Sequence, residues 1–473
     1  MQENNKKPNI LLIMPDQMRG DCLGLDGNPA ILTPNMNEIG AKGAYFEQAY
    51  TTCASCIPAR RSLLTGQYPK TNGLVGFKNG LPINSLTLPQ VLQNSGYDTL
   101  LVGRNMHQYP EEEDYGYQKR LLGSTYIEDD DYSEMLAEKL PDSGGVRGHG
   151  ISCNGWTAKP WHLPEYLHPT NWIVNQARDI INNRNENKPF FLTASFYAPH
   201  PPLIPPAFYM ERYLRVDCPP PAIGNWAQPP ENKGLGAGID AHRTCLEGEA
   251  LKSAQAGYYG LINHLDDQLY YLISDFKRKS WEQGVPWVII VTSDHGEMMG
   301  DHYYFRKCEP YDGSSRIPFL IQGSPELNLK SGVKNNSPVC LEDIMPTLLD
   351  LADLSTPENV DGHSLVPLLK GKTEEVRSVL HAEHSPCYSR EQAYQMLTDG
   401  KFKYIWRPES GREQLFNLEQ DPREKKDLSQ LKKWEDELAC WRNKLIDILK
   451  DRPEGFTDGE KLIPVKDYDA FLD

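Results

Sequence analysis

The sequence predicts an α/β fold in which helices cover both faces of a large, mainly parallel sheet. Three observations support this prediction: buried apolar runs, helical patterns between them, and a change of pattern near residue 380. Four short runs are candidates for buried strands, since nearly every position in them is apolar: residues 10–14, 99–102, 190–196 and 287–291. We expect a catalytic α/β domain over residues 1–375 and a C-terminal α+β subdomain over residues 376–473.

Helical patterns separate the predicted strands. A helix over residues 88–94 is expected to begin behind Thr87 as its N-cap and to end at Gly96. Two longer segments, residues 173–181 and 258–276, keep apolar side chains at helical spacing. Strands that alternate with helices are typical of a parallel sheet that is covered on both sides.

From about residue 380 the pattern becomes antiparallel. Residues 392–397 and 402–406 flank an Asp-Gly pair, which predicts a tight hairpin. Residues 415–418 are another candidate strand, and an amphipathic helix is expected after Ser429. These elements predict a small C-terminal antiparallel sheet with a helix.

The charge of the chain argues against nucleic acid as a partner. Lys and Arg number 49 and Asp and Glu 65, so the net charge is −16, which repels polyphosphate at long range. The apolar runs are far shorter than the ~20 residues of a membrane-spanning helix, so we expect no membrane span. The N-terminus shows no secretory signal. We favour a periplasmic or secreted protein that lacks its signal here, with a cytoplasmic one as the alternative, and the ten scattered cysteines do not decide between them.

Residues 53–66 contain the first candidate site. Pro58 can open a helix and Gly66 can close it, which puts Cys56 just ahead of the helix N-terminus. Free backbone N–H groups and a partial positive charge at that position suit an anion or a polarised nucleophile. Arg60 lies about one turn further on and can reach back to residue 56.

An alternative interpretation of this segment is a redox or zinc pair formed by Cys53 and Cys56. No second cysteine pair or Cys-His partner lies nearby in the sequence to complete a zinc site, which disfavours the alternative.

Two acidic groups follow predicted strands. Asp16-Gln17 comes after the first of the four strands, and Asp294-His295 comes after the last. Groups just beyond the carboxyl ends of parallel strands converge on one crevice. Two carboxylates, an amide oxygen and an imidazole would there form a cage for a divalent cation. The alternative is that Asp16 and Asp294 only cap the turns or helices that follow them.

The pattern Cys56-x-Pro58-x-Arg60, followed by Leu-Leu-Thr-Gly, resembles the signature of the type I, formylglycine-dependent sulfatases of the alkaline phosphatase superfamily. The chain departs from that signature at Ala59, where the family usually has Ser. The resemblance implies an alkaline phosphatase-like fold, a bacterial carbohydrate sulfatase, and conversion of Cys56 to formylglycine, the catalytic aldehyde. It also implies a maturing partner, either a formylglycine-generating enzyme or an anaerobic sulfatase-maturating enzyme.

The resemblance further implies one divalent cation. Its ligands would be Asp16, Gln17, Cys56 as formylglycine, Asp294 and His295. Ca²⁺ is expected because the donors are mainly oxygens, and Mn²⁺ is the alternative that the imidazole suggests. Gln17 stands where sulfatases usually have a second Asp, and the same variant occurs among phosphonate and phosphodiester hydrolases of the superfamily. The preference between sulfate and phosphate therefore stays open.

Cationic groups extend the resemblance. Lys307 lies nine residues before Arg316, as in the family, and His200 follows the third predicted strand. Arg104 and His107 stand where the family has Lys followed by His. The catalytic residues that the resemblance implies are Cys56, Arg60, Arg104, His107, His200 and Lys307. Several histidines are expected to be structural, with His302 undecided: His149, His162, His168, His242, His264, His381 and His384.

The implied reaction is hydrolysis of a sulfate ester. Formylglycine hydrated to a gem-diol would attack sulfur, while the cation, Arg60, Arg104 and Lys307 hold the sulfuryl oxygens. His200 would protonate the departing alcohol. His107 would then remove a proton so that sulfate leaves, although the roles of the two histidines could be exchanged.

The expected substrate is a glycosaminoglycan-derived saccharide of the heparin/heparan or chondroitin type. A loop in the middle of the chain offers Arg147, His149, Trp156 and Trp161, and Trp faces with Arg forks suit an acidic or sulfated sugar. The alternative is a surface loop packed by its own aromatic side chains. Residues 201–248 are rich in Pro and Gly and too long for an ordinary connection, so they are a candidate lid.

Two other functions stay open. A phosphonate monoester or phosphodiester hydrolase would use the same nucleophile and cation. A non-catalytic binder of sulfated glycans would result if Cys56 stays unmodified.

Overall fold

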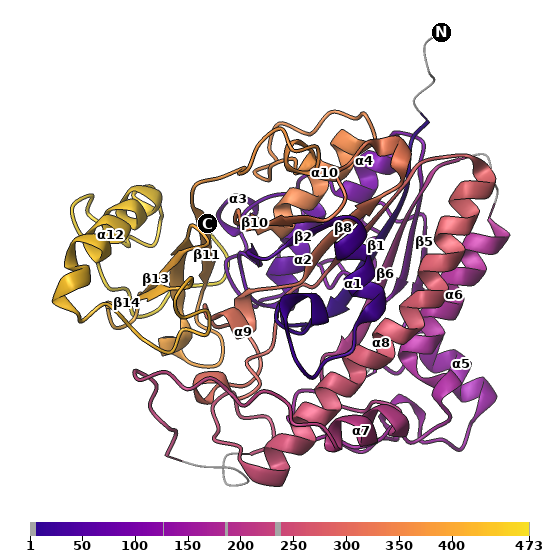
Figure 1. The fold of residues 1–473 in the computed structure, drawn as a ribbon, viewed down its shortest axis with the longest axis horizontal. Coiled ribbons are helices and arrows are strands. Elements are labelled where there is room, and N and C mark those ends of the chain that lie inside the picture. Colours follow the sequence, from indigo (N-terminus) through magenta and orange to yellow (C-terminus); the bar gives the residue numbers. More distant parts are fainter. Residues whose placement is uncertain (1–5, 126, 185–187, 232–237, 473) are drawn as a thin grey trace.

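The central sheet that the sequence predicts is present in the computed structural model, which describes residues 6–125, 127–184, 188–231 and 238–472 (Figure 1). Its eight strands run in the order β5 (Lys119–Leu122), β4 (Asp98–Gly103), β6 (Phe190–Pro199), β1 (Asn9–Asp16), β7 (Trp287–Thr292), β8 (Phe319–Gly323), β2 (Ala44–Phe46) and β9 (Val333–Asn335). Neighbouring strands are parallel except in the β7–β8 and β2–β8 pairs. The prediction of a mainly parallel sheet is confirmed.

Side chains of β1 alternate between two hydrophobic cores, one on each face of the sheet. Leu11 and Ile13 belong to the first core, and Ile10, Leu12 and Met14 belong to the second. The helices that contribute to the first core are α1 (Pro34–Lys42), α5 (Asp131–Lys139), α6 (Pro169–Asn183), α7 (Ala207–Leu214) and α8 (Gly248–Gln283). Those that contribute to the second core are α2 (Cys56–Thr65), α4 (Leu88–Asn94), α10 (Ile344–Leu351) and α11 (Val366–Leu369). Helices therefore cover both faces, as predicted.

A second, four-stranded antiparallel sheet follows, in the order β11 (Leu380–His384), β12 (Tyr394–Thr398), β13 (Phe402–Arg407) and β14 (Arg412–Asn417) (Figure 1). Trp441 and Leu445 of helix α12 (Glu435–Leu449) pack in a core on one face of this sheet. The other face, with Met396 and Ile405, packs against Tyr50 of the larger part of the molecule. The predicted antiparallel sheet with a helix is confirmed, and it is fastened to the rest by a shared core.

The remaining short elements are α3 (Pro69–Asn72), α9 (Asp312–Ser315) and a parallel strand pair, β3 (Ala49–Tyr50) with β10 (Val339–Cys340). The predicted domain boundary between residues 375 and 376 falls between α11 and β11. It stays a prediction.

Two helices show how closely the sequence predicts boundaries. α4 covers the predicted range, and Thr87 caps it in a capping box. α2 begins at Cys56, two residues earlier than Pro58 predicts, with Ser55 as its N-cap, and Gly66 closes it with a left-handed φ of 67°. Cys56 is therefore the first residue of the helix and does not lie ahead of it.

The candidate lid over residues 201–248 is partly helical, because α7 lies within it. Residues 232–237 fall outside the described ranges. None of the other residues of the candidate lid lines the cavity at Cys56, whereas Pro219 and Pro221 line a separate one. In the part that the structure describes, this segment therefore gives no support to a lid over the candidate site.

The cysteines and the helices bear on two further expectations. All ten cysteines lie within the described ranges and are free thiols, so Cys53 and Cys56 are not joined to each other. Across the described part of the chain, every helix is too short or too polar to cross a bilayer.

Gly103 generates a prediction about stability. It ends β4 with a φ of +103°, and a Cβ atom there would lie 2.0 Å from the backbone O of Ser195, to which Arg104 N donates a hydrogen bond of 2.8 Å. We expect Gly103→Ala to destabilise the protein by about 2 to 4 kcal/mol, because the two backbones must move apart. The thermal unfolding midpoint measures this loss.

Gly459→Ala is the matched control. Gly459 has a similar φ of +95°, but no described atom lies within 4 Å of its Cβ position. It should lose only the strain of a left-handed residue, about 1 kcal/mol. Equal losses in the two variants would contradict the packing argument.

Candidate active site

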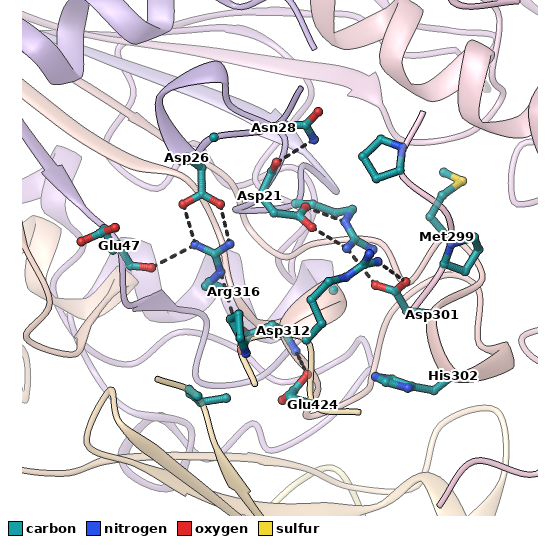
Figure 2. Close-up of a pocket in the computed structure, with 18 of the residues that line it drawn as sticks. Asp21, Asp26, Asn28, Glu47, Met299, Asp301, His302, Asp312, Arg316 and Glu424 are labelled. Atoms are coloured by element: carbon teal, nitrogen blue, oxygen red, sulfur yellow. Dashed lines mark hydrogen bonds and ion pairs between the residues drawn. The ribbon is translucent and has the colours of Figure 1, made fainter. Parts of the chain in front are cut away.

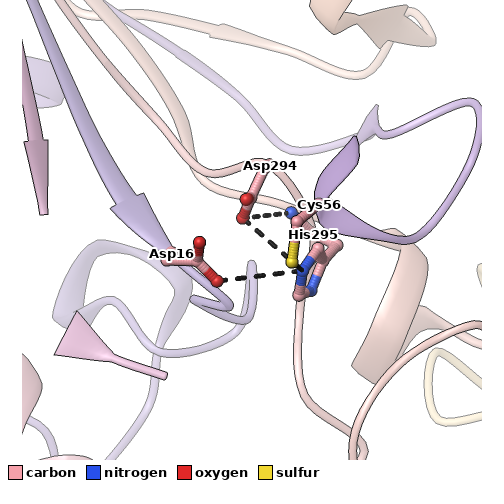
Figure 3. A group of neighbouring side chains, drawn as sticks. All are labelled: Asp16, Cys56, Asp294 and His295. Carbon is pink, nitrogen blue, oxygen red and sulfur yellow. Dashed lines mark hydrogen bonds and ion pairs between the residues drawn. The ribbon is translucent and has the colours of Figure 1, made fainter. Parts of the chain in front are cut away.

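The carboxyl ends of β1 and β7 bring two acidic residues together. Asp16 is the last residue of β1, and Asp294 lies two residues beyond the end of β7. Cys56, at the start of α2, and His295 lie beside them (Figure 3). The ligating atoms of these four buried residues all lie within 4.8 Å of one another. The structure thus brings together four of the five residues that the sequence predicts around the cation.

These four residues fit a divalent cation. Asp16 Oδ1 is buried and has no hydrogen-bond partner among the described residues. His295 Nε2 lies 3.8 Å from Asp16 Oδ1 and 3.8 Å from Asp294 Oδ1. The Nδ1 atom of His295 donates to the backbone O of Gly296 at 2.9 Å, which turns Nε2 toward the carboxylates. Carboxylate oxygens with an imidazole nitrogen are a donor set that suits a hard or borderline cation.

Gln17, the fifth predicted ligand, lies between the acidic and the cationic residues. Its backbone is left-handed, with a φ of 65°, and its N–H donates to Asp294 Oδ1 at 3.1 Å. The side-chain Oε1 accepts a hydrogen bond of 3.3 Å from Lys307 Nζ, and Nε2 donates to Glu297. The amide is therefore held in one orientation, and its role as a ligand stays a prediction.

Two arginines compensate the buried carboxylates. Arg60 is fully buried, with Nε 2.8 Å from Asp294 Oδ2 and Nη2 2.8 Å from Asp16 Oδ2. Arg104 also pairs with Asp16. An uncompensated buried carboxylate would carry a desolvation penalty of roughly several kcal/mol, so these pairs are needed for the fold to keep both acids inside. Arg60 does not line the cavity among the described residues, which makes it a group that orients the two carboxylates.

Cys56 lies in a strongly cationic setting. Its Sγ accepts a hydrogen bond of 2.9 Å from Lys307 Nζ and lies 3.2 Å from His295 Nε2. Burial alone raises the pKa of the Cys56 thiol, but Lys307, His295 and Arg104 together hold that pKa well below its usual value. The cations around residue 56 therefore stabilise a negative charge on the terminal atom of its side chain.

The two predicted catalytic histidines lie on the same cavity wall as Cys56. His200 Nδ1 donates to the backbone O of Pro201 at 2.7 Å, and Nε2 lies 3.2 Å from Lys307 Nζ. Burial, followed by the charges of Lys307 and Arg104, lowers the pKa of His200 well below its usual value. A hydrogen bond from His107 is one of the smaller causes that lower the pKa of Cys56. Both imidazoles can therefore serve chemistry at position 56.

A cavity of about 600 Å³ opens onto Cys56. Arg147 and His149 of the predicted sugar-binding loop line it, together with Arg104, His107, His200 and Lys307. Trp156 and Trp161 are buried and do not line it, so the predicted stacking on these two indoles is wrong for the described cavity. Phe77, Tyr197 and Tyr388 supply its aromatic rings instead.

Several residues at the site were missed by the sequence analysis. Arg306, Phe77, Tyr197 and Tyr388 line the cavity, although no motif marks them. His384, which we expected to be purely structural, accepts a hydrogen bond of 2.8 Å at Nε2 from the Ser55 hydroxyl, because its Nδ1 donates to the backbone O of Ser385. No motif in the sequence marks this contact, because it joins the start of α2 to the end of β11.

A second cavity, of about 370 Å³, is lined by many acidic residues (Figure 2). Its acids form ion pairs with arginines and lysines: Arg316 pairs with Asp26 at 2.8 Å, Arg19 with Asp21 at 2.7 Å, and Lys403 with Glu424 at 2.6 Å. His302, which the sequence left undecided, also lies here and accepts a hydrogen bond from Gly224 N. This cavity is a network of ion pairs without the cationic character of the first.

Comparison with known proteins agrees with this geometry. The model of the sulfatase family matches residues 8–354, and a model described as N-sulphoglucosamine sulphohydrolase, C-terminal, matches residues 300–451. The chain therefore belongs to the sulfatase family, and it is an enzyme of the sulfuric ester hydrolase class. The resemblance in the sequence motifs is confirmed.

Individual relatives extend the comparison over nearly the whole chain. An arylsulfatase of Clostridium perfringens is 40% identical, with 97% of each chain covered. The phosphonate monoester hydrolase of Agrobacterium radiobacter has the same fold, with a TM-score of 0.79, 24% identity, and coverage of 94% of this chain and 96% of that one. A protein solved with its substrate D-glucosamine-2-N,6-O-disulfate also shares the fold, with a TM-score of 0.75, 21% identity, and coverage of 95% and 99%.

The cationic setting of Cys56 predicts its reactivity in protein that carries the free thiol. Iodoacetamide should alkylate Cys56 at lower pH than an ordinary thiol, whose pKa is about 8.5, because Lys307 favours the thiolate. Lys307→Met should move the alkylation profile to higher pH, since it removes the largest charge that lowers the pKa. Peptide mass spectrometry reads the two profiles, with the exposed Cys440 as internal reference. An unchanged profile in Lys307→Met would contradict the described contact.

Proposed function

We propose that this sulfatase hydrolyses a sulfate ester on a glycosaminoglycan-derived saccharide of the heparin/heparan or chondroitin type. One observation carries the proposal: Cys56 Sγ lies between Lys307 and His295, beside two buried carboxylates, on a cavity whose described wall is cationic. The match of the C-terminal part to the N-sulphoglucosamine sulphohydrolase model supports the saccharide class.

In this proposal Cys56 acts as formylglycine. A formylglycine-generating or anaerobic sulfatase-maturating enzyme would produce it, and the hydrated aldehyde supplies an oxygen nucleophile where the thiol now lies. The N-terminus of α2 and the ammonium of Lys307 both favour negative charge at that position. The chain thus provides the electrostatic setting that such a nucleophile needs.

One divalent cation, Ca²⁺ in the first place and Mn²⁺ as the alternative, would be held by Asp16, Gln17, Asp294, His295 and residue 56. When bound, it neutralises charge on the sulfuryl oxygens and favours ionisation of the nucleophile. The unpartnered Asp16 Oδ1 and the orientation of His295 support this assignment.

The side chains of the site would bind the sulfate group, orient the carboxylates and transfer protons. Lys307 and Arg104 line the cavity and would bind the sulfuryl oxygens. Arg60 would hold the two carboxylates in place through its paired hydrogen bonds. His200 would deliver a proton to the leaving alcohol, since an anionic sulfate group raises the proton affinity of a neighbouring imidazole. His107 would accept a proton at residue 56 when sulfate departs.

Two alternatives define what the assays must separate. Gln17 in place of a second Asp keeps a phosphonate monoester or phosphodiester hydrolase as the second candidate. A protein with an unmodified Cys56 would be a non-catalytic binder of sulfated glycans. We propose a periplasmic or secreted location, with the cytoplasm as the alternative.

Replacement of the nucleophile and of a ligand tests the mechanism. Cys56→Ala and Asp294→Ala should each lower kcat on 4-nitrophenyl sulfate by about 10³-fold or more, because each removes a group on which the reaction depends. Cys53→Ala should stay within about threefold of the parent, because the Cys53 thiol is buried away from the cation ligands. An active Cys56→Ala enzyme would exclude this mechanism.

Two measurements on the same preparation separate the alternatives. Peptide mass spectrometry should find an aldehyde at residue 56 in protein from a host with a maturing enzyme, whereas a free thiol throughout would favour the binder. Sulfate turnover should exceed turnover of bis(4-nitrophenyl) phosphate and of a phenyl phosphonate monoester. The reverse order would make the phosphorus ester the substrate.

The cation assignment is tested by metal analysis. Asp16→Asn should weaken binding of Ca²⁺ by about tenfold or more, because it removes a charged oxygen from the site. Equilibrium dialysis with metal quantification measures this change without reference to activity. Asp275→Asn is the control and should leave binding unchanged, because Asp275 lies on α8, where it pairs with Arg178 of α6. Full metal occupancy in Asp16→Asn would overturn the ligand set.

A further inference from the structure

The cavity at Cys56 carries more positive charge than one sulfate group needs. Lys307 and Arg104 lie at its reacting end, where they contact Cys56 and Asp16. Arg147 and Arg306 line it as well, and no carboxylate lies among the described residues of its wall. This wall differs from the protein as a whole, which has a net charge of −16. Such local reversal of charge points to an anionic ligand.

Arg306 is a cation of this wall that stands apart from the reacting end, where Lys307 contacts Cys56. Among the described residues it forms no ion pair, and its one side-chain hydrogen bond runs from Nη1 to the backbone O of Asp240 at 3.0 Å. Arg147, in contrast, already pairs with Glu128 at 3.0 Å. The planar fork of Arg306 therefore keeps donors for a carboxylate or a sulfate group.

A cation–π contact holds the Arg306 side chain at the cavity. Its guanidinium carbon lies 4.3 Å from the centre of the Tyr388 ring, and Tyr388 lines the same cavity. The backbone N–H of Tyr388 donates to Gln392 Oε1 at 2.9 Å, and the centre of the Tyr388 ring lies 5.5 Å from that of the His242 ring. A guanidinium already held against an aromatic ring loses less conformational entropy when it binds an anion.

The backbone of Arg306 is also constrained. Its φ of 71° is left-handed, an unfavourable region for a residue with a side chain, and its N–H donates to the buried carboxylate of Glu297. The next residue is Lys307, which reaches Cys56 Sγ. Strain of this kind persists where the surroundings impose it, often at binding sites. This constrained backbone places Arg306 beside Lys307, the residue that would hold the reacting sulfate.

We propose that Arg306, stacked on Tyr388, forms a second anion subsite for a carboxylate or a further sulfate group of the substrate. The inference rests on the proposed sulfatase reaction at Cys56 and narrows its substrate class. The preferred substrate is a saccharide with at least two negative charges, of which one is the sulfate that is removed. An alcohol with a positive charge is disfavoured, because it would face Arg306 across the cavity.

Arg306→Gln tests the subsite, since it keeps a polar side chain and removes the charge. Hydrolysis is compared on three substrates: 4-nitrophenyl sulfate, sulfated disaccharides with a uronate carboxylate, and glucosamine sulfates with one or two sulfate groups. We expect Arg306→Gln to lower kcat/KM by about 10- to 100-fold on substrates with a second anion, mainly through KM. On 4-nitrophenyl sulfate the change should stay within about threefold. Arg306→Lys should recover part of the loss, because it keeps the charge without the fork.

The control is Arg278→Gln on the exposed face of α8, which should match the parent on every substrate. Thermal unfolding shows whether each variant is folded. A second measurement needs no variant: a uronate disaccharide without sulfate should inhibit the parent enzyme more strongly than its neutral analogue does.

The outcomes separate this inference from the function on which it rests. Loss on the uronate substrates alone identifies a carboxylate subsite, and loss on the disulfated sugar alone identifies a sulfate subsite. An equal loss on all substrates, or no loss with equal inhibition by both disaccharides, overturns the subsite while sulfatase activity stands. A parent enzyme that hydrolyses no sulfate ester overturns the proposed function itself.

Discussion

The burial of two carboxylates at the ends of β1 and β7 is the constraint on which the rest of the site depends. Asp16 and Asp294 have no exposed surface, and each is bonded to the same guanidinium, that of Arg60. Paired hydrogen bonds to one planar group fix the relative orientation of the two acids. The same helix that carries Arg60 begins at Cys56, so one element sets both the acids and the reacting position.

The C-terminal sheet supports this arrangement from the other side. The Ser55 hydroxyl does not cap its own helix and instead donates to His384 at the end of β11. Gln392 Nε2 donates to the backbone O of Lys307 at 3.2 Å. Residues beyond 380 thus form hydrogen bonds to two groups next to Cys56: Ser55, at the start of α2, and Lys307. The small sheet is therefore part of the site and not an appendage.

The centre of the large sheet was predictable from the sequence, because β1, β4, β6 and β7 are buried and form apolar runs. The edge strands β5 and β9 were not, because they are short, polar and partly exposed. The residues at strand ends were predictable for a related reason, since Asp16 and Asp294 must meet if their strands are parallel neighbours. The outer cavity was not predictable. Arg306 and Tyr388 are brought together by tertiary packing, and neither belongs to a periodic pattern or a motif. Trp156 and Trp161 could not be placed from the sequence either, because residue type alone does not tell an aromatic side chain that packs inside, as these two do, from one that faces a ligand.

The contact between Ser55 and His384 joins residues that are 329 positions apart in the chain. A ribosome that makes this protein therefore releases Cys56 long before it releases the residues that enclose it. During that interval the hydrogen bond between Ser55 and β11 is missing. Once the chain is complete, the Cys56 thiol is buried and faces the cavity of about 600 Å³, so a reagent or enzyme that acts on it must approach through that cavity.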